Sequence, residues 1–99
     1  MSDAVEVVDN EAEKRFEVTI DGHHALLTYK RNPKRMVLEH TEVPDELEGR
    51  GVGSALVKAA IAYAVEHELT VVPRCPFARS WLERHPDQAA QVSIVWPGV

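Results

Sequence analysis

The sequence has little cysteine, few aromatic residues and no long apolar run. Cys75 is the only cysteine of the 99 residues, so no disulfide can form within the chain, and a reducing compartment is expected. No stretch has the roughly 20 consecutive apolar residues that cross a membrane, and the acidic start lacks the apolar segment of a secretory signal. We therefore expect a cytoplasmic protein without membrane association.

Positive charge is also scarce. Lysine and arginine number 11 against 16 aspartates and glutamates, which gives a formal net charge of −5. Binding to nucleic acid or to anionic lipid needs a broad basic face, so neither is expected as a partner. The local basic cluster of Lys30, Arg31, Lys34 and Arg35 is typical of a solvated hairpin turn, with a local binding patch as the alternative.

Length and composition fit one compact domain that spans residues 1–99. Hydrophobic residues make up 44% and charged residues 27% of the chain, an ordinary balance for a globular protein with a core. No repeat, low-complexity stretch or linker divides the sequence, so a second domain is not expected.

The first half of the sequence has the two-residue period of β-strands. Phe16, Val18 and Ile20 alternate with polar residues, and Asp21-Gly22 is a strong signal for a tight turn. Consecutive strands with short turns predict an antiparallel meander. The four expected strands lie at 4–10, 14–20, 23–31 and 35–43.

The second half changes to a helical period. Val52, Leu56, Ala60 and Tyr63 recur at the spacing of one helix face, which predicts a helix at roughly 51–67. A buried strand at 69–75, a second helix at 76–85 and a tail that forms an edge strand or packs loosely are expected to follow. The order β-β-β-β-α-β-α predicts an α+β fold: a mostly antiparallel mixed sheet with one β-α-β crossover.

The glycine-rich stretch EGRGVG, residues 48–53, lies between a strand and a helix. Its alternating glycines lack Cβ atoms, so the backbone can adopt positive φ and approach a ligand closely. The first amides of a helix have no internal acceptor and, with the helix dipole, can bind an anion. A phosphate site is therefore one interpretation and a plain turn is the other, because the spacing matches neither a dinucleotide-binding fingerprint nor a P-loop.

Residues 40–86 resemble the core of the GCN5-related N-acetyltransferase (GNAT) superfamily, and more narrowly its small single-domain members with a cysteine after the last core strand. The loop corresponds to the acetyl-CoA motif Arg/Gln-x-x-Gly-x-Gly/Ala, with Glu48 at the position that is usually Arg or Gln. The resemblance implies a minimal GNAT fold with a parallel strand pair that a β-bulge splays apart. It also implies acetyl-CoA or CoA as cofactor, held by Thr41 and Val43 on the strand and by Gly49, Arg50, Gly51, Val52, Gly53 and Ser54 at the helix start.

Acetyl transfer to an amine needs a base for the amine and a proton source for the leaving thiolate. His40 and Glu42 alternate onto one strand face, and either is a candidate base, with a structural imidazole and an exposed carboxylate as the alternatives. Cys75 is a candidate general acid or nucleophile, with an inert buried thiol as the alternative. Many GNATs carry a tyrosine acid on the next helix, where this sequence has Trp81 and Leu82.

The acceptor side is expected to be shallow and open. Full-length GNATs usually have one or two helices between their first two strands, whereas only residues 9–13 separate them here. No pair of histidines has metal-ligand spacing on one face, so no metal site is expected.

The expected function is direct acetyl transfer from acetyl-CoA to an unidentified amine, on a protein or a small molecule. A homodimer that completes the acceptor site and a lost acceptor site remain alternatives. A CoA- or acetyl-CoA-binding module with little or no catalysis is the second functional interpretation.

Overall fold

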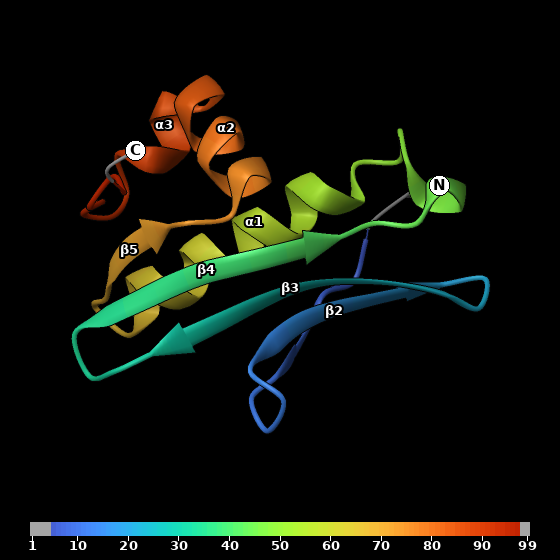
Figure 1. The fold of residues 1–99 in the computed structure, drawn as a ribbon, viewed down its shortest axis with the longest axis horizontal. Helices are drawn as coiled ribbons and strands as arrows, with labels where there is room; N and C mark the ends of the chain where they lie inside the picture. The colour runs from blue at the N-terminus through green and yellow to red at the C-terminus, as the bar shows by residue number, and fades with distance from the viewer. Residues whose placement is uncertain (1–4, 98–99) are drawn as a thin grey trace.

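The computed structural model describes residues 5–97, whose strands form one five-stranded sheet in the order β1-β2-β3-β4-β5 (Figure 1). The first four strands are antiparallel neighbours and β5 runs parallel to β4, which confirms the predicted meander with a parallel end. The strands are β1 (Val8–Asn10), β2 (Arg15–Ile20), β3 (His23–Arg31), β4 (Arg35–Glu42) and β5 (Thr70–Pro73).

The helices follow the predicted order, with two additions. The long helix expected at 51–67 is α1 (Val52–Glu66), and α2 (Pro76–Arg84) ends just before His85, where a proline follows. The additions are a 3₁₀ turn, η1 (Asp45–Leu47), and a short helix, α3 (Pro86–Ala89). Within residues 5–97, no helix is long and apolar enough to cross a membrane.

The ends of the chain differ from the sequence prediction. The first strand was expected from residue 4, which lies outside the described residues, but β1 begins only at Val8. In the tail, Ile94 forms a single parallel bridge with Val71, and the Trp96 side chain stays exposed. The tail therefore extends the β5 edge by one bridge, while residues 98–99 lie outside the described part.

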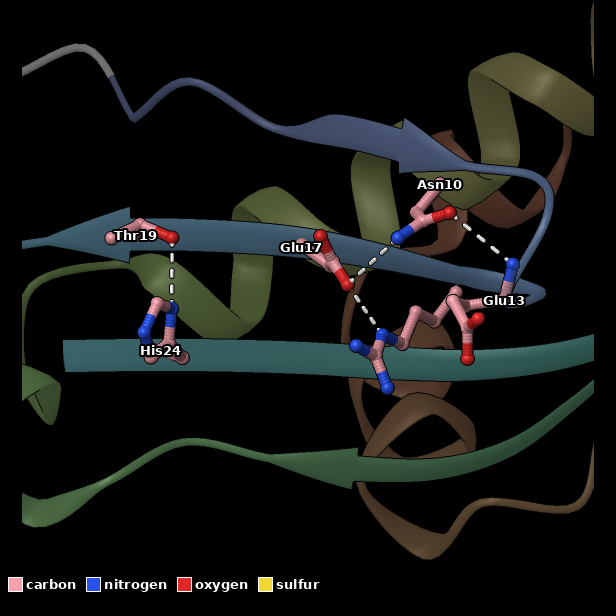
Figure 2. Close-up of polar contacts among 6 residues, drawn as sticks. Asn10, Glu13, Glu17, Thr19 and His24 are labelled. Carbon is pink, nitrogen blue, oxygen red and sulfur yellow. Dashed lines mark hydrogen bonds and ion pairs between the residues drawn. The ribbon is translucent and has the colours of Figure 1, made fainter.

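The helices cover one face of the sheet and leave the other open. Leu27 and Tyr29 of β3 and Met36 and Leu38 of β4 are buried in one core, because α1 packs behind the sheet and α2 lies beside β5 (Figure 1). Figure 2 looks onto the opposite face, where polar side chains such as His24 lie in front of the strands. We call this uncovered side the outer face.

A β-bulge in β4 and an early end of β5 open the sheet. Thr28 pairs with His40 and Tyr29 with Leu38, so Glu39 is the extra residue of the bulge. The last β4–β5 pair joins Leu38 to Pro73, while β4 continues to Glu42. The two strands therefore separate after Leu38, which confirms the splayed pair and the bulge that the resemblance implied.

Candidate functional site

A cavity of about 660 Å³ lies between the end of β4, the glycine-rich loop and α2. Thr41 and Val43 line it from the β4 side, and residues 47–54 except Arg50 line it from the loop and the first turn of α1. Four side chains from α2 and its C-terminal end complete the wall: Phe77, Trp81, Arg84 and His85. The splayed strand and the loop, which are separate motifs in the sequence, thus face a single space.

The three glycines of the loop serve different purposes. Gly49 and Gly51 have φ of +80° and +75°, in the left-handed region that side chains with a Cβ rarely adopt. Gly53 lies in the first turn of α1 without positive φ, and a Cβ there would come within 2.6 Å of Phe77 Cζ. Two glycines therefore form the turn, and the third allows an aromatic ring to approach the helix.

The start of α1 carries free backbone donors. Its first helical hydrogen bond runs from the Ala55 amide to the Gly51 carbonyl at 3.0 Å, so the amides of Val52, Gly53 and Ser54 precede any helical acceptor. Within residues 5–97, no side chain caps this helix. These amides and the helix dipole suit an anion such as a pyrophosphate, and all three residues line the cavity.

A chain of polar contacts ties α2 to the start of α1. Trp81 Nε1 donates to Ser54 Oγ, and the Trp81 ring stacks on His85 with centroids 3.9 Å apart. His85 Nδ1 donates to the Trp81 carbonyl at 2.7 Å, since a carbonyl can only accept. These contacts fix the indole between two walls of the cavity.

Sequence reasoning identified Trp81 only as a replacement for tyrosine and did not single out Phe77, Arg84 or His85. Their spacing, i, i+4, i+7 and i+8, is that of one helix face, and this signal could have grouped them. It could not have shown that the face borders the glycine loop, because that contact is tertiary.

The two charged residues of the loop lie on different sides of it. Arg50 does not line the cavity: its Nη1 is 3.9 Å from Asp21 Oδ2, and its amide donates to the Leu47 carbonyl. The Glu48 residue does line the cavity. The loop thus presents a carboxylate residue and backbone amides to the cavity, and turns its guanidinium toward the β2–β3 hairpin.

The candidate catalytic residues Cys75, His40 and Glu42 lie on two sides of β4. Cys75 Sγ is 2.9 Å from Thr41 Oγ1, and this thiol is buried on the inner side. His40 Nε2 and Glu42 Oε2 are 2.9 Å apart and exposed, on the outer face, since His40 pairs with Thr28 of that face. Within residues 5–97, no three histidine, cysteine, aspartate or glutamate side chains form a metal-ligand cluster.

The family follows from a sequence comparison. The family model for the GCN5-related N-acetyltransferase matches residues 15–92, which is most of the chain. The chain belongs to the GNAT family. The fold that the resemblance implied, with its splayed strands and its glycine loop before α1, is accordingly a GNAT fold.

Named relatives and a solved structure are similar to this GNAT chain. Protein NATD1 from chicken is 35% identical over 85 residues, which covers 83% of this chain and 77% of that protein. Human protein NATD1 has the same identity over 75% of its own length, and the zebrafish protein is 30% identical over 89 residues. The NMR structure of a GCN5-like protein from Staphylococcus aureus matches with a TM-score of 0.68 and 32% identity, covering 100% of this chain and 93% of that one.

Proposed function

We propose that this GNAT chain transfers an acetyl group from acetyl-CoA directly to an amine. One observation carries the proposal: the free amides at the start of α1 and the splayed end of β4 border the same cavity. Acetyl-CoA, when bound, supplies the activated acyl group as a thioester. The amides of Val52, Gly53 and Ser54 would hold its pyrophosphate, and Thr41 and Val43 would line the path of its pantetheine arm.

The two faces of β4 separate the two substrates. The thioester end belongs at the splay, next to Thr41, while the outer face presents the His40–Glu42 pair to solvent. In the proposed reaction an acceptor amine approaches from the outer face, and His40 takes its proton directly or through a water molecule. Glu42, which contacts His40 Nε2, would orient the imidazole.

The leaving thiolate needs a proton as the carbon–nitrogen bond forms and the carbon–sulfur bond breaks. Cys75 and Thr41 are candidates because their side chains contact each other at the splay. Trp81, on the helix where many GNATs carry a tyrosine acid, has only an indole N–H, which donates to Ser54. The proton for the leaving CoA thiolate would therefore come from Cys75, assisted by Thr41, or from solvent.

A second candidate function is binding of CoA or acetyl-CoA without turnover. The specific observation in its favour is Glu48, an acidic residue that lines the cavity where phosphate oxygens would lie. A negative charge there weakens an anion site unless the side chain turns away. Binding and turnover must therefore be measured separately.

Calorimetric titration with CoA and with acetyl-CoA tests the binding site. We expect saturable binding to the wild type and at least tenfold weaker binding to Gly53→Glu, which adds bulk and negative charge beside the free amides. Ala62→Glu is the matched control, because it places the same side chain on the exposed side of the same helix. Absence of CoA binding to the wild type at millimolar concentration would refute both candidate functions.

Release of free CoA thiol from acetyl-CoA in the presence of a panel of amines then separates the two functions. If the chain is an enzyme, His40→Gln should lower kcat about 100-fold, in the range of general-base catalysis, with little change in the affinity for acetyl-CoA. His24→Gln, an exposed histidine of the same face, serves as control. Binding without turnover across the panel would support the second candidate.

A further inference from the structure

A second cavity, of about 360 Å³, lies on the outer face where β3, β4 and β5 are paired. Val37 and Val72 form its floor, and four cationic residues line it around them: Lys30, Arg31, Arg35 and Arg74. We call this cavity the outer hollow. It is separate from the cavity at the glycine loop, since the two share no lining residue.

The strand register explains why the cations surround an apolar floor. Lys30 pairs with Val37, and Val37 pairs with Val72, so these residues form one row across three strands. Arg35 precedes Val37 by two positions on β4, and residues two apart on a strand share a face. Arg74 lies just beyond the end of β5 and lines the same hollow. Val72 is only 8% exposed, although no helix within residues 5–97 lies over this face.

The charges of the outer hollow are only partly neutralised. Lys30 Nζ lies 3.6 Å from Glu39 Oε2, whereas Arg35 and Arg74 form no ion pair with any residue in 5–97. Arg31 contributes to the wall but directs its Nη1 to the Tyr63 hydroxyl. A solvated hairpin turn accounts for Lys30 and Arg35, but not for Arg74, which the end of β5 brings to the same place.

The outer hollow lies beside the candidate base. Thr28, which pairs with His40, and Lys30, which pairs with Val37, are two residues apart on β3, so the two rows are about 7 Å apart. The Arg74 amide donates to the Leu38 carbonyl, which is the point where β4 and β5 separate. An acceptor at the splay on the outer face would therefore lie next to Arg74.

We propose that the outer hollow binds a carboxylate or phosphate of the acceptor, so that the acceptor is a small amine with an anionic group. This inference rests on the proposed transferase function. The two arginines without ion pairs can each bind a carboxylate or phosphate through two hydrogen bonds. The valine floor suits an aliphatic segment between the anionic group and the reacting nitrogen, over a distance of about 7 Å.

An NMR titration with inorganic phosphate, and separately with acetate, tests the anion site without requiring turnover. Amide signals of Val37, Val72 and Arg74 should shift in a saturable way, and the shifts at residues 52–54 report the other anion site independently. The double variant Arg35→Gln/Arg74→Gln should weaken the response of Val37 and Val72 at least tenfold. Lys58→Gln, which removes an exposed cation from α1, should leave it unchanged. Unaltered binding in the double variant, or no shift at the outer hollow, would overturn the proposal.

A turnover comparison tests the link to the acceptor. Paired substrates differ only in the anionic group: ω-amino acids against their methyl esters, and phosphoethanolamine against ethanolamine. The acid of at least one pair should have a kcat/KM at least tenfold higher than its neutral partner, and Arg74→Gln should raise the KM of the acid while kcat stays nearly constant. The pair that shows the difference identifies carboxylate or phosphate as the preferred group.

The two proposals can fail separately. Equal turnover of acids and neutral partners would overturn the role of the outer hollow and leave the transferase function intact. Absence of CoA binding would overturn the transferase function, while the NMR titration would still decide whether the outer hollow binds anions.

Discussion

The packing of Phe77 against Gly53 makes a quantitative prediction about the start of α1. Gly53→Ala adds a single methyl group at a position without positive φ, so the backbone itself does not oppose the change. The added Cβ would lie 2.6 Å from Phe77 Cζ, closer than real Cβ contacts come, and 3.0 Å from Cε2, which is unusually tight. The Phe77 ring, 38% exposed, must therefore shift toward solvent.

Two effects of opposite sign set the expected magnitude. Alanine in place of glycine stabilises a helix by roughly 0.5–1 kcal/mol, and somewhat less in the first turn. Overpacking costs about 1–3 kcal/mol, toward the lower end here because an exposed ring can move. Gly53→Ala should therefore destabilise the wild type by about 1 kcal/mol. It should stabilise a Phe77→Ala background by about 0.5 kcal/mol, which gives a coupling energy of about 1.5 kcal/mol.

Urea unfolding of the wild type, both single variants and the double variant measures this coupling. The four proteins should share one m-value, so that the shifts of the midpoint report free energies directly. Acetyl-CoA titration of the same four proteins shows whether the Phe77 ring, which borders the free amides, also affects ligand affinity.

Equal effects of Gly53→Ala with and without Phe77 would refute the reasoning. In that case the ring would not restrict position 53, and the third glycine of the loop would be explained by ligand approach instead. A coupling of opposite sign would equally contradict the steric argument.

Three further predictions concern the loop and the sheet. Gly51→Ala should lower the free energy of unfolding by about 1–2 kcal/mol, because φ at this position is +75°, and urea unfolding measures the loss. The hydrogen bond from Arg15 lowers the pKa of the Glu17 carboxyl. Its contribution to stability is therefore present at pH 7 and lost as the pH falls below the ordinary value of 4.5, so urea midpoints of wild type and Glu17→Gln should converge in acid. Burial, together with the 2.9 Å hydrogen bond to Asp9, raises the pKa of the Tyr29 phenol. Absorbance at 295 nm should therefore show a phenol that ionises late in the native protein, and Tyr29→Phe should remove this signal. The same variant should lower the free energy of unfolding by about 1 kcal/mol, because it removes the hydrogen bond.

The order of elements and most of their bounds were predictable from local sequence patterns. Alternation around Val18, the Asp21-Gly22 turn and the helical spacing from Val52 to Tyr63 are local properties, and the structure confirms the strands, the hairpin and the long helix that they predict. The single bridge at Ile94 was less predictable, because one pair of residues leaves no periodic signal.

The glycine loop could be located from sequence because its cause is also local. Positive φ at Gly49 and Gly51 and free amides at a helix start depend on neighbouring residues only. The steric reason for a glycine at position 53 could not be predicted from sequence, because the Phe77 ring packs against it from another helix.

Tertiary structure alone decided which functional residues meet. The bulge at Glu39 sets the register by which His40 lies on the outer face and Thr41 on the inner face, and a bulge leaves no reliable mark in a sequence. The contact of Thr41 with Cys75 depends on the point where β5 leaves β4, and the grouping of Arg74 with Arg35 depends on the parallel register of the same strands. Local pattern thus determined the elements and the glycine-rich loop before α1, whereas strand register determined which candidate residues lie on each face of β4, because register joins residues that are distant in the chain.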